Sequence, residues 1–287
     1  MKQAIVKVKV EDLQRVEQLI LANKHTSSLK VGSEYEAFRI RCEGDTIVGY
    51  TSGKIVCSGP HAEAIVQTAV RGLTESEARK RFVIGSDEAG KGEWLGPLVV
   101  AAVATTGNQS RELQSLGVMD SKEVPLHRLS KLAVEIESGC AAKSVLLISP
   151  ETFNKRLQEL HDEGKNLNDL LAWGHAKVIS DVYSALSSTE TIRIVVDEFA
   201  RTKTQQRLSR VIPLDKVDLI QRPRAEDEIA VAAASILARE AREQWIDQSS
   251  IRMKLDLREL SVPEALARSD RESFSKIQYL EKLSLHE

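Results

Sequence analysis

Residues 81–105, RFVIGSDEAGKGEWLGPLVVAAVAT, constrain the fold of this chain more than any other stretch. They contain two apolar runs, residues 81–89 and 97–105, separated by a short glycine-rich segment. Two apolar runs of strand length joined by such a turn are typical of a β-hairpin. Pro97 fits the beginning of the second strand, because proline has no N–H to give to a neighbouring strand. The pattern therefore predicts a hairpin inside a buried sheet.

The same stretch contains the spacing of a phosphate-binding loop, which runs from Gly85 to Lys91. Such a loop continues with Ser or Thr and leads into a helix. Here Gly92 follows the lysine, and the next element is a predicted strand. Asp87 and Glu88 would also lie inside the loop and repel a triphosphate. The sequence thus argues against a nucleotide-binding loop and leaves two adjacent acids at the end of a strand.

A second apolar strand ends in the same pair of acids. Residues 191–200, TIRIVVDEFA, run into Asp197 and Glu198. Further on, residues 217–245 predict a strand, a turn at a proline, and a helix that begins near Glu226. The helix contains AVAAASIL, which is apolar on all sides and therefore predicts burial.

Each acid taken alone would ordinarily be solvated, but their arrangement favours a site. Buried strands and a buried helix from distant parts of a chain tend to bring their polar ends to one rim of a sheet. Clustered carboxylates repel one another, and hard divalent cations relieve that repulsion. The sequence therefore predicts a metal site formed by the strand-end acids and the head of the helix.

Residues 1–78 predict a separate small α+β domain, followed by a charged linker, TESEARKR, over residues 74–81. Alternating and helical spacings of apolar residues give a βαβββα-like order. The expected elements are a strand over 3–10, a helix over 11–24, antiparallel strands over 34–60 and a helix over 61–73.

Composition limits where and how the protein acts. Forty basic and 42 acidic residues give a net charge of −2, so binding to a polyanion requires a local basic patch. The three cysteines have no metal-ligand spacing and are interpreted as reduced thiols. No signal peptide or membrane-length apolar run is evident, which predicts a cytoplasmic protein with no membrane partner.

Five segments, in order, resemble the type 2 ribonucleases H, and the resemblance is closest to the ribonuclease HIII branch. They are SDEAGKGEWLGPLVVAAV, GVMDSKEV, NLNDLLAWGHAKVI, IVVDEFA and AEDEIAVAAASILARE. That branch typically carries an N-terminal domain resembling half of the TATA-binding protein, which suits residues 1–78. The resemblance implies a ribonuclease H-like α/β domain over residues 79–287, with a mixed sheet flanked by helices.

The resemblance also implies an activity. It is the endonucleolytic hydrolysis of the RNA strand of RNA–DNA hybrids, which leaves 3′-hydroxyl and 5′-phosphate ends. The cofactors would be two divalent ions, Mg²⁺ or Mn²⁺, and the protein is expected to be a monomer. A related nuclease acting on another substrate, such as a DNA junction, remains an alternative.

The family's motifs assign roles to particular residues. The catalytic, metal-binding acids would be Asp87, Glu88, Asp197 and Glu226, with Asp227 as the alternative for the fourth. The substrate-binding residues would be Gly90, Lys91, Gly92, Ser121 and Lys122. His175 is interpreted as a core or supporting histidine in preference to a catalytic one. Candidate phosphate contacts of the N-terminal sheet are Lys7, Lys9, Arg39, Arg41 and Lys54, although such residues also serve solubility.

Overall fold

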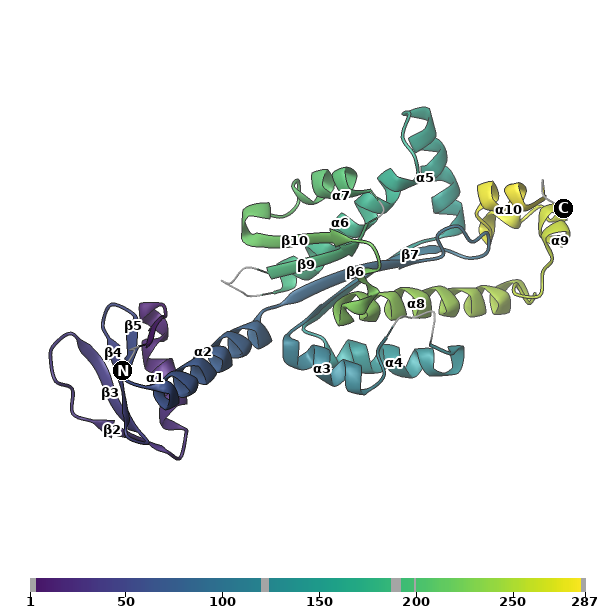
Figure 1. Cartoon of the computed structure of the whole chain (residues 1–287). Coiled ribbons are helices and arrows are strands. Elements are labelled where there is room, and N and C mark those ends of the chain that lie inside the picture. Colours follow the sequence, from purple (N-terminus) through teal and green to yellow (C-terminus); the bar gives the residue numbers. More distant parts are fainter. Residues whose placement is uncertain (1–3, 120–123, 187–191, 199, 285–287) are drawn as a thin grey trace. The chain divides into compact units, whose positions relative to one another are not determined.

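The computed structural model describes residues 4–119, 124–186, 192–198 and 200–284, and for residues 73–80 it describes the backbone alone. The chain forms two compact units, Met1–Lys80 and Arg81–Glu287. Each unit is described by itself (Figure 1).

The first unit is an antiparallel five-stranded sheet with the strand order β1-β5-β4-β3-β2. Helices α1 (Leu13–Leu21) and α2 (Pro60–Lys80) pack their apolar side chains onto one face of it, around Ile40, Ile47 and Ile55. The strands are β1 (Ala4–Lys7), β2 (Thr26–Leu29), β3 (Glu36–Cys42), β4 (Asp45–Tyr50) and β5 (Lys54–Cys57).

Three details of this unit differ from the sequence prediction. The first strand ends at Lys7, because Val10–Asp12 forms a 3₁₀ turn that leads into α1. Strand β2 was not predicted, since TSSL has too few apolar residues to show alternation. The predicted linker is helical, because α2 continues through it to Lys80.

The second unit contains a mixed five-stranded sheet with the order β10-β9-β6-β7-β8. Strands β6, β9 and β10 are parallel to one another, whereas β7 runs antiparallel to both of its neighbours, β6 and β8. The predicted hairpin is therefore present as β6 and β7. The strands are β6 (Val83–Ala89), β7 (Leu98–Thr105), β8 (Ala142–Ile148), β9 (Ile192–Asp197) and β10 (Val217–Arg222).

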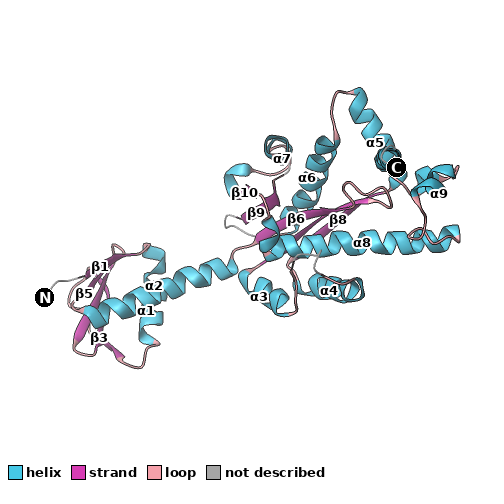
Figure 2. Ribbon diagram, turned by 45° about the vertical axis from the view of Figure 1, so that its right-hand side comes forward, coloured by secondary structure: helices cyan, strands magenta, loops and turns pink. Residues whose placement is uncertain are grey.

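Helices cover both faces of this sheet (Figures 1 and 2). Alternate residues of β7 explain the two layers: Val99, Ala101 and Val103 pack toward α3, α4 and α8. Val100 and Ala102 pack toward α6 and α7. Every residue of β7 is buried, so its sequence is a continuous apolar run. The expected mixed sheet flanked by helices, preceded by a small α+β domain, is confirmed.

The helices of the second unit are arranged in chain order between and after these strands. They are α3 (Gly107–Ser115), α4 (Leu126–Gly139), α5 (Pro150–Asp162), α6 (Leu167–Ala185), α7 (Arg201–Leu208), α8 (Ile229–Met253), α9 (Val262–Ala267) and α10 (Ile277–Ser284). Helix α8 begins at Ile229 rather than near Glu226, which lies in a preceding 3₁₀ turn. In the described part of the chain, no helix combines the length and apolarity that crossing a bilayer requires.

Candidate active site

The acids at the ends of β6 and β9 lie at the same rim of the sheet. The two strands are parallel neighbours, and Ser86 pairs with Val196 in their register. Asp87 and Asp197 are the next residues along each strand, so their backbones are adjacent. On its other side Asp197 pairs with Arg222 of β10.

Asp87 is half-buried and faces α8. Its carboxylate accepts a hydrogen bond from Ser235 of that helix. Helix α8 packs so closely on β6 that a Cβ on Gly85 would come within 2.2 Å of the backbone nitrogen of Val231. Burial raises the pKa of Asp87, and the adjacent charge of Glu88 raises it further. Asp87 is therefore a carboxylate whose ionised form is destabilised until a cation approaches.

Glu88 faces the opposite layer and contacts α6. His175 of that helix is only 1% exposed, and its Nε2 donates to Glu88 Oε2 at 3.1 Å. Its Nδ1 lies 2.9 Å from the hydroxyl of Ser86. Burial alone would raise the pKa of Glu88, but the hydrogen bond and charge of His175, with Lys91, hold it below its usual range. Glu88 is thus kept ionised, and the interpretation of His175 as a supporting histidine agrees with these contacts.

Asp197 differs from both acids of β6 in its hydrogen bonding. Its Oδ1 atom is buried and has no hydrogen-bond partner among the described residues. Buried polar atoms in folded proteins are almost always paired, and an unpaired carboxylate oxygen is costly. This atom therefore needs a partner such as a metal ion or a bound water.

Three acids lie at the head of α8, and the structure distinguishes between them. Asp227 is exposed, with 68% of its side chain accessible, and forms an ion pair with Arg222. Glu226 is half-buried on the same 3₁₀ turn. Glu228 is the N-cap of α8, and burial raises its pKa. The ion pair occupies Asp227, which favours Glu226 over Asp227 as the acid available to the rim.

The Gly90-Lys91-Gly92 turn lies directly after β6. Gly90 has φ +85°, and a Cβ there would come within 2.2 Å of the carbonyl oxygen of Pro97. Gly92 has φ +78° with no atom within 4 Å of its Cβ position, so its backbone is open to close approach. Lys91 Nζ lies 3.0 Å from Glu88. Ser121 and Lys122 lie outside the described residues.

The acids do not yet surround a common point. Within the described ranges, no three carboxylate, imidazole or thiolate groups are clustered as they would be around a metal ion. The contacts above give the reason, because Glu88 is turned to His175 and Lys91 while Asp87 is turned to Ser235. Side-chain rotation is therefore required before these acids share an ion.

Sequence reasoning missed two hydroxyl groups that lie beside these acids. Ser86 lies within an apolar strand and bonds to His175. Ser235 contacts Asp87 from the middle of the alanine-rich helix. A hydroxyl in an otherwise apolar, buried helix is a signal that a polar partner lies opposite it, and this signal could have identified Ser235.

Comparison with known proteins places the chain in a family. Residues 84–261 match the family described as ribonuclease HII. A ribonuclease HIII of Protochlamydia amoebophila is 37% identical over 232 residues, which cover 78% of this chain and 74% of the relative. A ribonuclease HIII of Chlamydia pneumoniae is 35% identical over 223 residues, covering 74% of this chain and 71% of the relative.

Solved structures share the fold. A crystal structure of Bst-RNase HIII in complex with Mn²⁺ covers 100% of both chains, with a TM-score of 0.60 and 22% identity. The structure of Aquifex aeolicus RNase H3 covers 96% of this chain and 100% of that chain, with a TM-score of 0.55 and 20% identity. The family match spans most of the chain, and the relatives agree with it over most of their own lengths. The chain therefore belongs to the type 2 ribonuclease H family, among relatives that are ribonucleases HIII.

Proposed function

We propose that this protein is an endonuclease that hydrolyses the RNA strand of RNA–DNA hybrids with the help of two divalent metal ions. The observation that carries the proposal is the buried Oδ1 of Asp197, which has no hydrogen-bond partner among the described residues and lies next to the Asp87-Glu88 pair at one rim of the sheet. A protein does not ordinarily leave such an atom unpaired beside two further carboxylates. Bound cations would satisfy the oxygen and neutralise the three charges.

The donor atoms fit the proposed ions. Asp87, Glu88, Asp197 and Glu226 would hold them, and carboxylate oxygens are the ligands that Mg²⁺ and Mn²⁺ prefer. The Bst-RNase HIII structure, which contains Mn²⁺, supports a divalent ion in this fold. When bound, such ions lower the pKa of a water molecule and stabilise charge on the leaving oxygen. Hydrolysis of this kind would leave 3′-hydroxyl and 5′-phosphate ends.

Neighbouring residues of the chain would orient these ligands. His175 fixes Glu88 from α6, and Ser235 fixes Asp87 from α8. Each contact would hold its carboxylate at the rim, and the side-chain rotation described above would then bring the acids to a shared ion. The head of α8 then supplies Glu226 from a third element.

The glycine turn would meet the substrate beside the acids. The open backbone at Gly92 permits a ribose to approach closely, and the 2′-hydroxyl is the group that distinguishes RNA from DNA. Lys91 neutralises Glu88 in the described structure. We infer that Lys91 turns to a substrate phosphate once cations take over that charge. Ser121 and Lys122 are proposed to contact a phosphate by family resemblance alone.

The open face of the N-terminal sheet would bind the hybrid. Lys7 of β1 and Lys54 of β5 are adjacent in the register, and both are exposed. Arg41 of β3 is also exposed, whereas Arg39 is held by Glu36. The exposed cations supply a local basic surface on a chain with no net positive charge.

We also infer a cytoplasmic monomer. The three cysteines are free thiols, which suits a reducing compartment. Light scattering of the purified protein would determine whether it is monomeric.

A panel of substrates tests the proposed function. RNA–DNA hybrid, double-stranded RNA, double-stranded DNA and a DNA junction are incubated with Mg²⁺, Mn²⁺ or EDTA, and end groups are analysed. We expect cleavage of the hybrid alone, dependence on the divalent ion, and 5′-phosphate products. Cleavage of the junction without the hybrid would establish the alternative nuclease, and cleavage in EDTA would exclude the metal site.

Salt dependence tests the N-terminal surface separately. Lys54→Ala should reduce the slope of log K against log salt for hybrid binding by about 0.9, because one phosphate contact is lost. Lys24→Ala, an exposed lysine after α1, provides the matched control and should leave the slope unchanged. Equal slopes for the two variants would show that the sheet face does not contact phosphate.

A further inference from the structure

The C-terminal segment of the chain lies against the loop that connects β6 to β7. The backbone N–H of Lys276 donates to the carbonyl of Trp94 at 2.7 Å, and that of Gly96 donates to Phe274 at 2.9 Å. Leu95 and Ser275 form an antiparallel bridge between these two bonds. Residues 94–96 and 274–276 are therefore held together although they lie far apart in the sequence.

Lys276 is fully buried at this junction. Its Nζ donates to the carbonyl oxygen of Gly96 at 2.5 Å and lies 3.4 Å from that of Pro97. It also lies 5.9 Å from the centre of the Phe153 ring. Burial lowers the pKa of Lys276 to about 7, and the charge of Arg242 acts in the same direction against that of Glu93.

An amine in this position stabilises the fold poorly. Its described partners are carbonyl oxygens and an aromatic ring rather than a carboxylate, so its desolvation is only partly offset. An apolar side chain of similar length would fill the same space at lower free energy. The specific effect of the amine is to fix the two carbonyl groups that it contacts.

Those carbonyl groups are coupled directly to the glycine turn. The Pro97 oxygen packs against Gly90, where a Cβ would lie only 2.2 Å from it. At the other end of the turn, the backbone of Gly92 lies close enough to Tyr279, one helical turn after Lys276, to lower the pKa of its hydroxyl against the effect of burial. Displacement of α10 would therefore displace both glycines of the turn.

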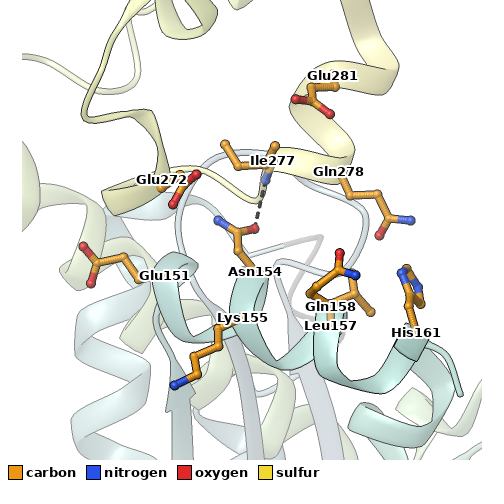
Figure 3. A pocket seen from close by; sticks show the side chains of 10 residues that line it. All are labelled: Glu151, Asn154, Lys155, Leu157, Gln158, His161, Glu272, Ile277, Gln278 and Glu281. Carbon is orange, nitrogen blue, oxygen red and sulfur yellow. Dashed lines mark hydrogen bonds between the residues drawn. The ribbon is translucent and has the colours of Figure 1, made fainter. Parts of the chain in front are cut away.

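Asn154 of α5 holds the backbone on both sides of Lys276. Its amide donates to the carbonyl of Ser275 at 2.9 Å and accepts from the N–H of Ile277 at 3.0 Å. Figure 3 shows the second of these bonds, in a cleft of about 510 Å³ between α5 and α10. The segment that carries Lys276 is thus fixed from α5 as well as from the loop.

We propose that Lys276 is a positioning residue for the Gly90-Lys91-Gly92 turn, which it holds over the strand-end acids through the carbonyl groups of Gly96 and Pro97. This inference rests on the proposed function, because it assigns the turn to substrate binding. Lys276 itself lies too deep to touch a nucleic acid. Its effect would therefore be on how well the substrate is held rather than on the chemical step.

The test is steady-state cleavage of an RNA–DNA hybrid by the full chain carrying Lys276→Met. We expect KM to rise about tenfold while kcat stays within about twofold, which corresponds to about 1.4 kcal/mol of lost substrate binding. Lys282→Met provides a matched control, since it removes the same charge from an exposed position of α10, the helix that begins directly after Lys276. KM of that variant should equal the wild-type value.

Two other results would overturn the inference. A fall in kcat at unchanged KM would show that Lys276 affects only the amount of folded enzyme. If Lys276→Met does not fold, Asn154→Ala loosens the same segment with the lysine in place, and an unchanged KM there would be equally decisive. A wild-type protein that does not cleave the hybrid removes the proposed function and this inference together, whereas active wild type with unaltered variants removes the inference alone.

Discussion

Strands β6 and β9 both carry the dipeptide Asp-Glu at or near their carboxyl ends, at the same rim of the sheet, but the two glutamates lie in different surroundings. Glu88 is only 10% exposed and contacts His175 and Lys91. Glu198 is 33% exposed and pairs with Arg201 at the surface. The first residue of each pair also differs, because Asp87 has Ser235 as a partner while Asp197 Oδ1 has none among the described residues.

The comparison shows that the layer behind a strand end decides what an acid does there. Successive side chains of a strand point to opposite faces, so one acid of each pair faces each helical layer. Beside β6, α6 supplies a buried histidine to the second acid. Beside β9, α7 supplies an exposed arginine, which draws the second acid into solvent. The two identical pairs therefore supply three of the proposed site acids, Asp87, Glu88 and Asp197, because Glu198 is drawn to the surface.

The largest effect should come from Asp197→Asn. The variant keeps the shape of the side chain but removes one negative charge from the proposed metal site, so kcat should fall at least about a thousandfold. Hybrid affinity in EDTA should hold or rise, because phosphate is repelled less. Asp215→Asn, an exposed acid near the beginning of β10, is the matched control. Near wild-type cleavage by folded Asp197→Asn would exclude the strand-end metal site.

The two glutamates provide the next largest contrast. Glu88→Gln should lower kcat about a hundredfold or more, since it removes a proposed ligand. Glu198→Gln should change kcat by less than about twofold, because its partner Arg201 lies at the surface. Metal-dependent cleavage of the hybrid by both variants measures the difference. Equal losses of kcat would mean that α6 and α7 do not give Glu88 and Glu198 different roles.

His175→Ala should weaken the response to metal about 10–100-fold, the usual effect of losing a residue that orients a ligand. Titration of activity with Mn²⁺ gives the activation constant, and circular dichroism shows that the variant is folded. His127→Ala, on the exposed side of α4, should leave the constant unaltered. An unchanged constant in folded His175→Ala would show that Glu88 needs no orientation from α6.

The smallest effect concerns stability and its pH dependence. Burial and the charge of Glu88 raise the pKa of Asp87 from 3.8 to about 6. A pKa raised on folding means that the ionised form destabilises the protein, fully above pH 6 and not at all below the unfolded pKa. In EDTA at pH 8, Asp87→Asn should therefore melt about 2–6 °C above the wild type, and the difference should vanish by about pH 3, below the unfolded pKa. Thermal melts at both pH values measure it, and a lower melting temperature at pH 8 would contradict the burial argument.

Strong local patterns made much of the fold predictable. The apolar runs that form β6, β7 and β9 needed no tertiary information, and α8 follows from an alanine-rich stretch that is apolar on all sides and comes after a turn at a proline. Strand β2 was not predicted, because TSSL gains its conformation by pairing with β3. The continuation of α2 was missed since a charged stretch without apolar periodicity resembles a linker.

The site could be predicted only in part, for a similar reason. The position of Asp87 and Asp197 at strand ends follows from the sequence, whereas their role as metal ligands stays a prediction. The contact between Glu88 and His175 joins residues 87 positions apart, and no local pattern encodes it. Asp227 is held in an ion pair by Arg222, and the two side chains meet only after the turn between β10 and α8 has formed.

The parallel pairing of β6 with β9 has a consequence for the order of folding. Ser86 and Val196 are neighbours in the sheet but 110 residues apart in the chain, and Ser235 must still arrive from α8 to contact Asp87. Contacts between residues so far apart in the chain form late, because closing a large loop costs conformational entropy before the contacts stabilise the fold. During synthesis, the β6–β7 hairpin emerges long before β9 and α8. The nascent chain therefore passes through most of its translation without an assembled acid cluster, and nuclease activity begins only when folding of the second unit is nearly complete.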